Sequence, residues 1–364
     1  MPDALHDIAT LSGHEARITG ACFAPGRSDR LLSCGKDGAL VVWTLTGEDH
    51  ADAQLFRHDA PITAAHFWPD DEAAIFCADD GTARLIDLGE GTETARFTTI
   101  EAMRADAAPS SPLARRIAAT ADAAGTIVAA LIPFGALLTA HQSAEQKKQR
   151  LSSAAADAAK SRLAAVSIKP ELILFDLASL EPLRSWKLPA EAAGPPVFLA
   201  NGSVAVCVGP KVLIFDEHTT RPIAAFKPSN TPLRHVLPLG PSAMIGVDES
   251  KHVVRIDLER TLSQVIARLP AQPEAVGLIG GRLLIGDTKR GVTELDLAAI
   301  APEPVFAEPL ILPGGKIRHI AGSDDGARFL AVTNDNRLRV YERRIIDPTS
   351  PASAAGPGGA PAPA

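Results

Sequence analysis

Short runs of apolar residues recur along the chain, and each run ends at a turn residue or an acid. The runs Ile18–Phe23 and Ile62–Phe67 are followed at the same phase by Pro25 and Pro69. Half-alternating runs of this length, rich in Val, Ile, Leu and Ala, are typical of strands packed between neighbouring sheets. We therefore expect an all-β chain built from short strands.

The runs are grouped into a repeat whose third run ends in a large apolar residue. These endings are Trp43, Ile86, Phe175, Phe215, Ile256, Leu295 and Tyr341. The gaps between them are 43, 89, 40, 41, 39 and 46 residues. A period of about 40–45 residues with several short strands is the signature of propeller blades. The sequence therefore predicts a ring of similar small sheets.

A polar signature accompanies the first repeat. It consists of Gly13-His14, Ser33, Asp37-Gly38 and Trp43. This pattern resembles the repeat of the WD-repeat β-propellers, and the resemblance runs from about residue 7 to residue 344. It implies blades that are four-stranded antiparallel sheets around a central channel.

The signature weakens after the first repeat. Repeat 2 keeps His58 and Asp80 but has Ile86 in place of the tryptophan, and the last repeat keeps Asp335 with Tyr341 at the aromatic position. The middle repeats have neither the Gly-His pair nor the aspartate. We therefore expect the shared hydrogen-bond network to change in the middle blades, while the fold is kept.

The two ends of the chain are expected to meet in one blade. The segment Asp7–Leu11 precedes the first Gly-His pair, where the family places the outer strand of the preceding blade. That blade must be the last one, with Arg337–Glu342 as its third strand and Ile8–Leu11 as its fourth. Such pairing removes exposed sheet edges.

The gap of 89 residues leaves the number of blades open. One interpretation is seven blades with an insertion over residues 133–162, where Ser143–Arg162 is rich in helix-favouring residues. The other is an eighth blade that begins with Arg116–Ala121 and Ile127–Ile132, ahead of a regular repeat over Leu151–Leu177. We prefer seven, the usual number in the family, within a single propeller over residues 1–346.

Residues 347–364 have a different composition from the rest of the chain. They are rich in Pro, Ala and Gly and contain no large apolar residue. Such a segment cannot bury enough surface to offset the entropy lost on ordering, so we expect a disordered tail.

His14, Ser33 and Asp37 are the residue types of a nucleophilic triad. In the WD-repeat family, however, this set forms a buried network with the tryptophan, in which the aspartate orients the histidine and the serine links it to the indole. The chain has no Gly-x-Ser-x-Gly motif that would expose a nucleophile. The resemblance therefore implies a structural network of His14, Ser33, Asp37 and Trp43, and we expect no catalytic residues and no enzyme activity.

Neither a cofactor nor a metal site is predicted. The acids Asp87, Asp176, Asp216, Asp257 and Asp296 recur at strand ends, which favours turn roles. The four cysteines and ten histidines show no metal-ligand spacing. A propeller hydrolase with a channel metal is the alternative enzyme class, and metal analysis of the purified protein would separate it from a binding protein.

Composition limits the partner and the compartment. The chain of 364 residues has a formal charge of −7, which argues against a general nucleic-acid or anionic-membrane binder. The cysteines lie in apolar runs, as in a reducing compartment, and residues 1–10 have no apolar signal core. We expect a cytoplasmic protein, or a nuclear one in a eukaryote.

One dense basic stretch interrupts the acidic balance. It contains Lys147, Lys148 and Arg150 and continues to Lys160 and Arg162. It is either a solvated surface or a docking site for an acidic partner or RNA, although no aromatic residues are interleaved for base stacking.

The favoured function is a non-catalytic platform that holds one or more proteins or peptides on one face of the ring. The family resemblance carries this expectation, and it adds Arg17, Lys36, Arg57 and Arg318, near the first strands of blades, as candidate partner contacts. The alternative is a subunit of a ribosome-assembly or RNA-processing complex that uses the basic stretch 147–162. Fold alone does not name the complex.

Overall fold

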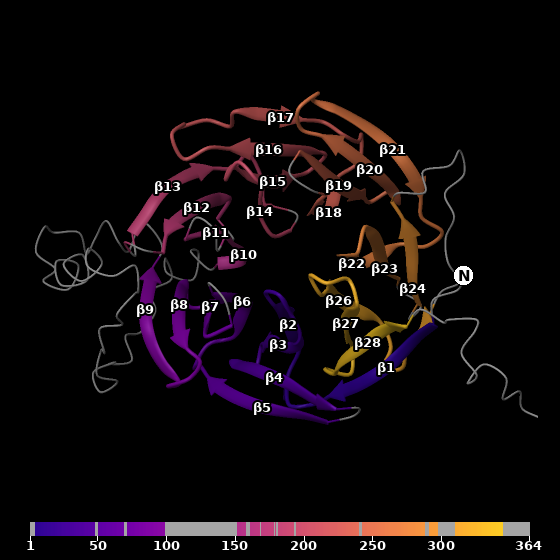
Figure 1. Cartoon of the computed structure of the whole chain (residues 1–364). Coiled ribbons are helices and arrows are strands. Elements are labelled where there is room, and N and C mark those ends of the chain that lie inside the picture. Colours follow the sequence, from indigo (N-terminus) through magenta and orange to yellow (C-terminus); the bar gives the residue numbers. More distant parts are fainter. Residues whose placement is uncertain are drawn as a thin grey trace, which may run out of the picture.

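The computed structural model describes residues 4–344 except 48–49, 69–70, 99–150, 158–160, 168, 178, 180, 193, 240–241, 288–290 and 298–309. The described residues form seven four-stranded antiparallel sheets and no helix. The sheets stand side by side around a centre, and the whole is a closed ring (Figure 1). The prediction of an all-β, seven-bladed propeller is therefore confirmed.

The first three blades follow the chain in order. Blade 1 contains β2 (Ile18–Ala24), β3 (Arg27–Gly35), β4 (Ala39–Gly47) and β5 (His50–Arg57). Blade 2 contains β6 (Ile62–Trp68), β7 (Ala73–Ala78), β8 (Thr82–Asp87) and β9 (Thr92–Thr98). Blade 3 contains β10 (Leu151–Asp157), β11 (Arg162–Ser167), β12 (Glu171–Asp176) and β13 (Glu181–Lys187).

Of the next three blades, blades 4 and 6 have short outer strands. Blade 4 contains β14 (Val197–Phe198), β15 (Val204–Val208), β16 (Lys211–Phe215) and β17 (Ala224–Phe226). Blade 5 contains β18 (Leu233–Pro238), β19 (Ala243–Asp248), β20 (His252–Asp257) and β21 (Leu262–Arg268). Blade 6 contains β22 (Pro273–Ile279), β23 (Arg282–Asp287), β24 (Gly291–Asp296) and β25 (Leu310–Ile311).

The last blade joins the two ends of the chain. Blade 7 contains β26 (Ile317–Gly322), β27 (Arg328–Thr333), β28 (Leu338–Arg344) and, as its outer strand, β1 (Ala4–Leu11). The register of β1 against β28 runs from Ala4 opposite Arg344 to Leu11 opposite Leu338. The predicted closure is confirmed, and β28 has no free edge along this register.

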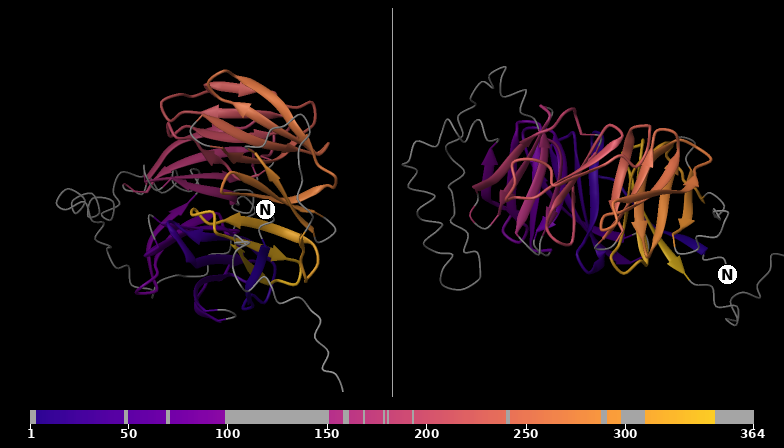
Figure 2. Two further views of the ribbon diagram at one scale, coloured as in Figure 1. Left: turned by 45° about the vertical axis from the view of Figure 1, so that its right-hand side comes forward. Right: turned by 90° about the horizontal axis from the view of Figure 1, so that it is seen from above.

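The strands of each blade are called a to d from the centre of the ring to its rim. Because they are antiparallel and consecutive, the b–c turns and the connections between blades lie on one side of the disc, which we call the bc face. The a–b and c–d turns lie on the other side, the ab face. The strands run between these two faces (Figure 2).

The hydrophobic core lies between the blades. Each of seven apolar clusters in the described structure joins two neighbouring blades. The cluster between blades 7 and 1, for example, packs Leu31 and Trp43 against Leu330 and Val340. Every blade is thus buried on both faces of its sheet, which explains why its strands carry near-continuous apolar runs.

Glycine is required at the b–c turn of blade 1. Gly38 has a φ of +71°, and a Cβ there would lie 2.0 Å from the carbonyl oxygen of His58. The N–H of His58 donates to the Gly38 carbonyl at 2.8 Å. The turn therefore holds the connection that leads from blade 1 to blade 2.

The alternative of an eighth blade is wrong. The helix suggested by the composition of residues 143–162 is wrong where the structure describes that segment. Blades 2 and 3 share one cluster, in which Ile75 and Cys77 pack with Leu151 and Leu163, so no further blade separates them. Residues 151–157 are the strand β10, because pairing with β11 and burial of Leu151 outweigh the helix propensity of alanine. The other residues of these two hypotheses, and the tail, lie outside the described residues.

Candidate functional site

The polar signature of blade 1 forms one connected network. The indole N–H of Trp43 donates to Ser33 Oγ at 2.8 Å, and Ser33 Oγ lies 2.9 Å from His14 Nε2. His14 Nδ1 lies 3.0 Å from Asp37 Oδ2. Because the serine oxygen accepts from the indole, its own hydroxyl donates to the imidazole, which in turn donates to the carboxylate. The structure thus brings His14, Ser33, Asp37 and Trp43 together, from the entry to β2, from β3, from the b–c turn and from β4.

Two features complete the surroundings of the network. Asp37 also accepts the N–H of Glu15 at 2.8 Å and that of Ala39 at 3.1 Å. A Cβ on Gly13 would lie 2.9 Å from the Trp43 ring. Glycine therefore lets the chain pass closely over the indole.

Burial sets the protonation of this pair. Burial lowers the pKa of His14, against the opposing effect of Asp37, so the imidazole is neutral in the fold. Burial alone would raise the pKa of Asp37, but the N–H groups of Ala39 and Glu15 and the His14 ring outweigh it, and the pKa lies below its ordinary value. A neutral histidine that donates to a carboxylate and accepts from a serine agrees with the order of donors in the network, from Trp43 through Ser33 and His14 to Asp37.

The geometry of the blade 1 network does not present Ser33 to a substrate. Ser33 has an exposed fraction of 0%. Its oxygen is already bonded to both the imidazole and the indole. A catalytic serine needs room for a substrate carbonyl beside it. These three residues therefore rigidify blade 1.

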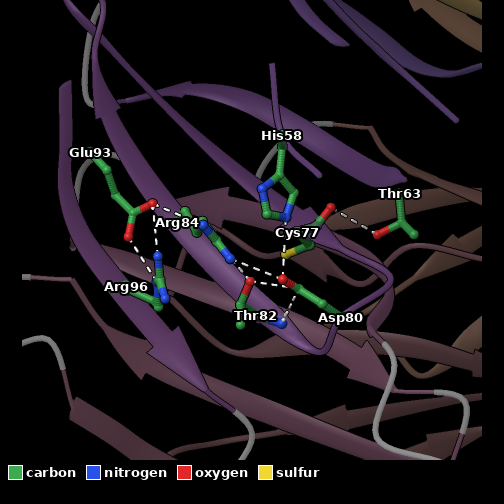
Figure 3. A network of polar contacts seen from close by, with 8 residues as sticks. All are labelled: His58, Thr63, Cys77, Asp80, Thr82, Arg84, Glu93 and Arg96. Atoms are coloured by element: carbon green, nitrogen blue, oxygen red, sulfur yellow. Dashed lines mark hydrogen bonds and ion pairs between the residues drawn. The ribbon is translucent and has the colours of Figure 1, made fainter. Parts of the chain in front are cut away.

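Blade 2 replaces the serine–tryptophan arm of the network with an arginine (Figure 3). Asp80 accepts from Arg84 at 2.9 Å and from the Thr82 hydroxyl at 2.6 Å, and it lies 3.2 Å from His58 Nε2. Arg84 also bonds Glu93, which in turn bonds Arg96. Burial alone would raise the pKa of Asp80, but His58, Thr82 and Arg84 hold it far below the ordinary value.

In blade 7, as in blade 2, an arginine bonds the aspartate of the b–c turn. Asp335 bonds the buried Arg339 at 2.6 Å and the Thr333 hydroxyl at 2.6 Å. The hydroxyl of the buried Tyr341, at the tryptophan position, has no hydrogen-bond partner among the described residues. Its neighbour across the sheet, Phe329, stacks on it with 5.0 Å between ring centroids. Sequence reasoning missed these arginines, although the aspartate is followed by an arginine four residues later in both blades.

An aspartate network also exists in blade 5, where the signature lacked its aspartate. Asp248, at the end of β19, accepts from Ser229 at 2.5 Å and from Thr231 at 2.7 Å, and its side chain has an exposed fraction of 0%. It further accepts the His252 N–H at 2.8 Å and lies 3.1 Å from His252 Nδ1. Asp248 pairs with the first residue of strand a, where Gly35 stands in blade 1, so it lies two residues before the signature position.

Polar side chains also bridge the innermost strands of neighbouring blades. His319 Nε2 donates to the Ala21 carbonyl at 2.7 Å, and His66 Nε2 donates to the Ala154 carbonyl at 3.0 Å. Thr19 donates to the Ile62 carbonyl at 2.7 Å. Burial lowers the pKa of both histidines. No sequence signal pointed to these cross-blade bonds.

The candidate partner contacts near strand a lie on the bc face. Arg17 and Lys36 are exposed. Arg57 forms an ion pair with Glu15 at 3.1 Å, and Arg318 donates to the Asn334 side chain. Lys147, Lys148 and Arg150 lie outside the described residues. Arg162, at the end of the basic stretch, forms an ion pair with Glu217 at 2.6 Å.

The strand-end acids take part in turns. Asp87 accepts the N–H groups of Gly89 and Glu90 at 2.8 and 2.9 Å, and Asp216 and Asp257 accept N–H groups of their own turns. Within the described ranges, no group of three His, Cys, Asp or Glu residues could hold a metal ion. The four cysteines are free thiols, and burial raises the pKa of each to about 12.

The described part of the chain contains no helix with the length and apolarity to cross a membrane.

Comparison with known proteins identifies the first repeat. Residues 6–44 match the family described as WD domain, G-beta repeat. A segment of 101 residues is 33% identical to the small ribosomal subunit protein RACK1 of Schizosaccharomyces pombe, covering 27% of this chain and 32% of that protein. A segment of 99 residues is 27% identical to the cross-pathway control WD-repeat protein 2 of Flammulina velutipes, covering 26% of this chain and 31% of that one. The matches thus span about a third of the length of these curated relatives.

The likeness in three dimensions covers nearly the whole chain. The WD40 β-propeller domain of Doa1 superimposes with a TM-score of 0.68 at 11% identity, over 94% of this chain and 98% of that domain. At this identity the likeness shows the fold. Together with the closed ring and the signature network of blade 1, these findings support the WD-repeat β-propeller family for this chain, with no specific subfamily.

Proposed function

We propose that this protein is a non-catalytic platform that holds one or more partner proteins on the bc face of its ring. WD-repeat propellers are in general protein-interaction scaffolds. The observation that carries the proposal is that the signature residues and the surface loops have different roles in the fold. The signature residues that resemble a triad form a buried network in blade 1, while the described loops join the strands of a ring closed through β1 and β28.

A rigid ring suits this task because binding then costs little ordering entropy. Loops fixed at both ends by strands lose less freedom on docking than a flexible segment does. The proposed location is the cytoplasm, which imaging of the tagged chain tests.

Purification of the full tagged chain from its source cells, with identification of proteins that co-purify in stoichiometric amounts, tests the platform. We expect a defined partner whose recovery falls for Arg17→Glu/Lys36→Glu. The matched control Arg221→Glu/Arg260→Glu changes the same charge on the ab face and should keep the partner. A chain that always elutes alone as a monomer would contradict the proposal.

A ribosome-associated role is the second candidate, because the matched relative from Schizosaccharomyces pombe is a ribosomal subunit protein. Sedimentation of cell extracts through sucrose tests it. Co-migration of the chain with ribosomal subunits that is lost after RNase treatment would favour this role, and migration at the position of the free chain would reject it.

A further inference from the structure

Basic side chains stand at the b–c turns around most of the ring. The described turns of blades 1, 3, 4, 5 and 7 have Lys36, Lys169, Lys211, Lys251 and Arg337 in or beside them. Blade 2 is the exception, with Asp79 and Asp80, and the turn of blade 6 lies outside the described residues. Because all b–c turns are on one side of the disc, these five residues form a cation ring on the bc face.

Most of this charge is available to a partner. Lys36, Lys211 and Arg337 are exposed, and no ion pair to them or to Lys251 occurs within the described residues. Acids of the same turns are bonded to other residues, and the exposed Glu249 of blade 5 pairs with Arg234. Asp37 is bonded to His14, and Asp335 is bonded to Arg339.

The ab face has the opposite character. The third strands of blades 2, 3 and 5 end there in Asp87, Asp176 and Asp257, and Asp216 follows the third strand of blade 4. Asp324 adds a further acid at the a–b turn of blade 7. The chain as a whole carries a charge of −7, while the described b–c turns of five blades carry the cation ring. Such a separation of charge orients an approaching acidic partner toward one face.

We propose that the cation ring docks a carboxylate-rich segment of a partner protein on the bc face. The inference rests on the proposed platform function and adds the docking face and the chemistry of the partner. A protein segment fits better than single-stranded nucleic acid, because the described b–c turns and blade connections contain no Phe, Trp or Tyr on which bases could stack.

Fluorescence anisotropy with a labelled oligoglutamate peptide tests the proposal on the full chain. The test variant is Lys36→Gln/Lys211→Gln/Arg337→Gln, which removes three exposed cations from the ring. The matched control is Arg221→Gln/Arg255→Gln/Arg260→Gln, which removes three exposed cations outside the ring and gives the same net charge. A labelled single-stranded RNA of mixed sequence serves as the competing class of ligand. Thermal unfolding confirms that both variants are folded.

An exposed ion pair changes affinity by about 1.4- to 5-fold. We therefore expect the test variant to bind oligoglutamate about 10-fold more weakly, and the control variant to stay within about 2-fold of the parent chain. Binding should weaken steeply with added salt, because surface charges are screened.

Three results would overturn the inference. They are no binding of oligoglutamate to the parent chain, equal loss in both triple variants, or tighter binding of the RNA than of the peptide. If any of these results occurs while a stoichiometric partner is still recovered from cells, the proposed platform function is kept. Only the proposal that the partner docks through a carboxylate-rich segment is then rejected.

Discussion

Replacing Asp37 by alanine isolates the structural role of the signature network. The carboxylate accepts three hydrogen bonds, from the His14 ring and from the N–H groups of Glu15 and Ala39. Water can replace it at the exposed Glu15 N–H. It cannot do so at His14, whose side chain is only 1% exposed. Asp37→Ala therefore leaves a buried imidazole N–H without an acceptor.

The size of the effect is estimated from the orphan imidazole donor. The N–H of Ala39, a residue with an exposed fraction of 0%, also loses its carboxylate acceptor. An unpaired buried donor costs about 1–3 kcal/mol. The chain has 364 residues. A specific unfolding entropy of about 2.1 cal/mol/K per residue then corresponds to about 0.8 kcal/mol per degree for the chain. We therefore expect the Tm to fall by about 1–4 °C.

Urea unfolding followed by tryptophan fluorescence, together with calorimetry, measures this loss. Asp59→Ala is the control, because Asp59 is an exposed acid in the connection to blade 2. Its expected change is within about 0.5 kcal/mol. Combining Asp37→Ala with Ser33→Ala should cost less than the sum of the single changes, since both act on one network. If Asp37→Ala is as stable as Asp59→Ala, the carboxylate does not support the blade.

Three other predictions follow from the closure, the unpaired tyrosine and the buried histidines. Deletion of residues 1–11 uncovers the edge of β28, so light scattering should show oligomers or aggregates in place of a monomer; a monomer of unchanged stability would refute the closure. Tyr341→Phe removes a buried hydroxyl without a partner, so the free energy of unfolding should stay the same or rise by about 1 kcal/mol, and a clear decrease in urea unfolding would contradict this. Because burial lowers the pKa of His66 and His319, the unfolded chain binds protons that the folded chain does not, and stability should fall as the pH drops below about 6.5. His66→Gln/His319→Gln keeps an amide donor that does not titrate, so unfolding titrations at about pH 7 and pH 5 should show a smaller loss than in the parent chain, and an equal loss would count against these two residues.

The repeat architecture was readable from the sequence because it depends on local patterns. Apolar runs that return every 40 or so residues predict similar sheets, and a strand-like segment ahead of the first signature predicts closure. The network of blade 1 was also accessible, since Gly13-His14, Ser33, Asp37 and Trp43 resemble a known repeat. Short segments can specify such features because each one depends on residues within a single repeat.

Features that join two repeats were decided by the tertiary structure. The strand over residues 151–157 depended on the pairing of β10 with β11 and on the neighbouring blade, which outweighed helix propensity. The bonds of His66 and His319 to the next blade, and the gathering of Lys36, Lys211 and Arg337 on one face, join residues far apart in the chain. A linear pattern records spacing within a repeat. The closed ring determines which repeats are neighbours and which turns share a face, and this arrangement sets the core and the proposed docking surface.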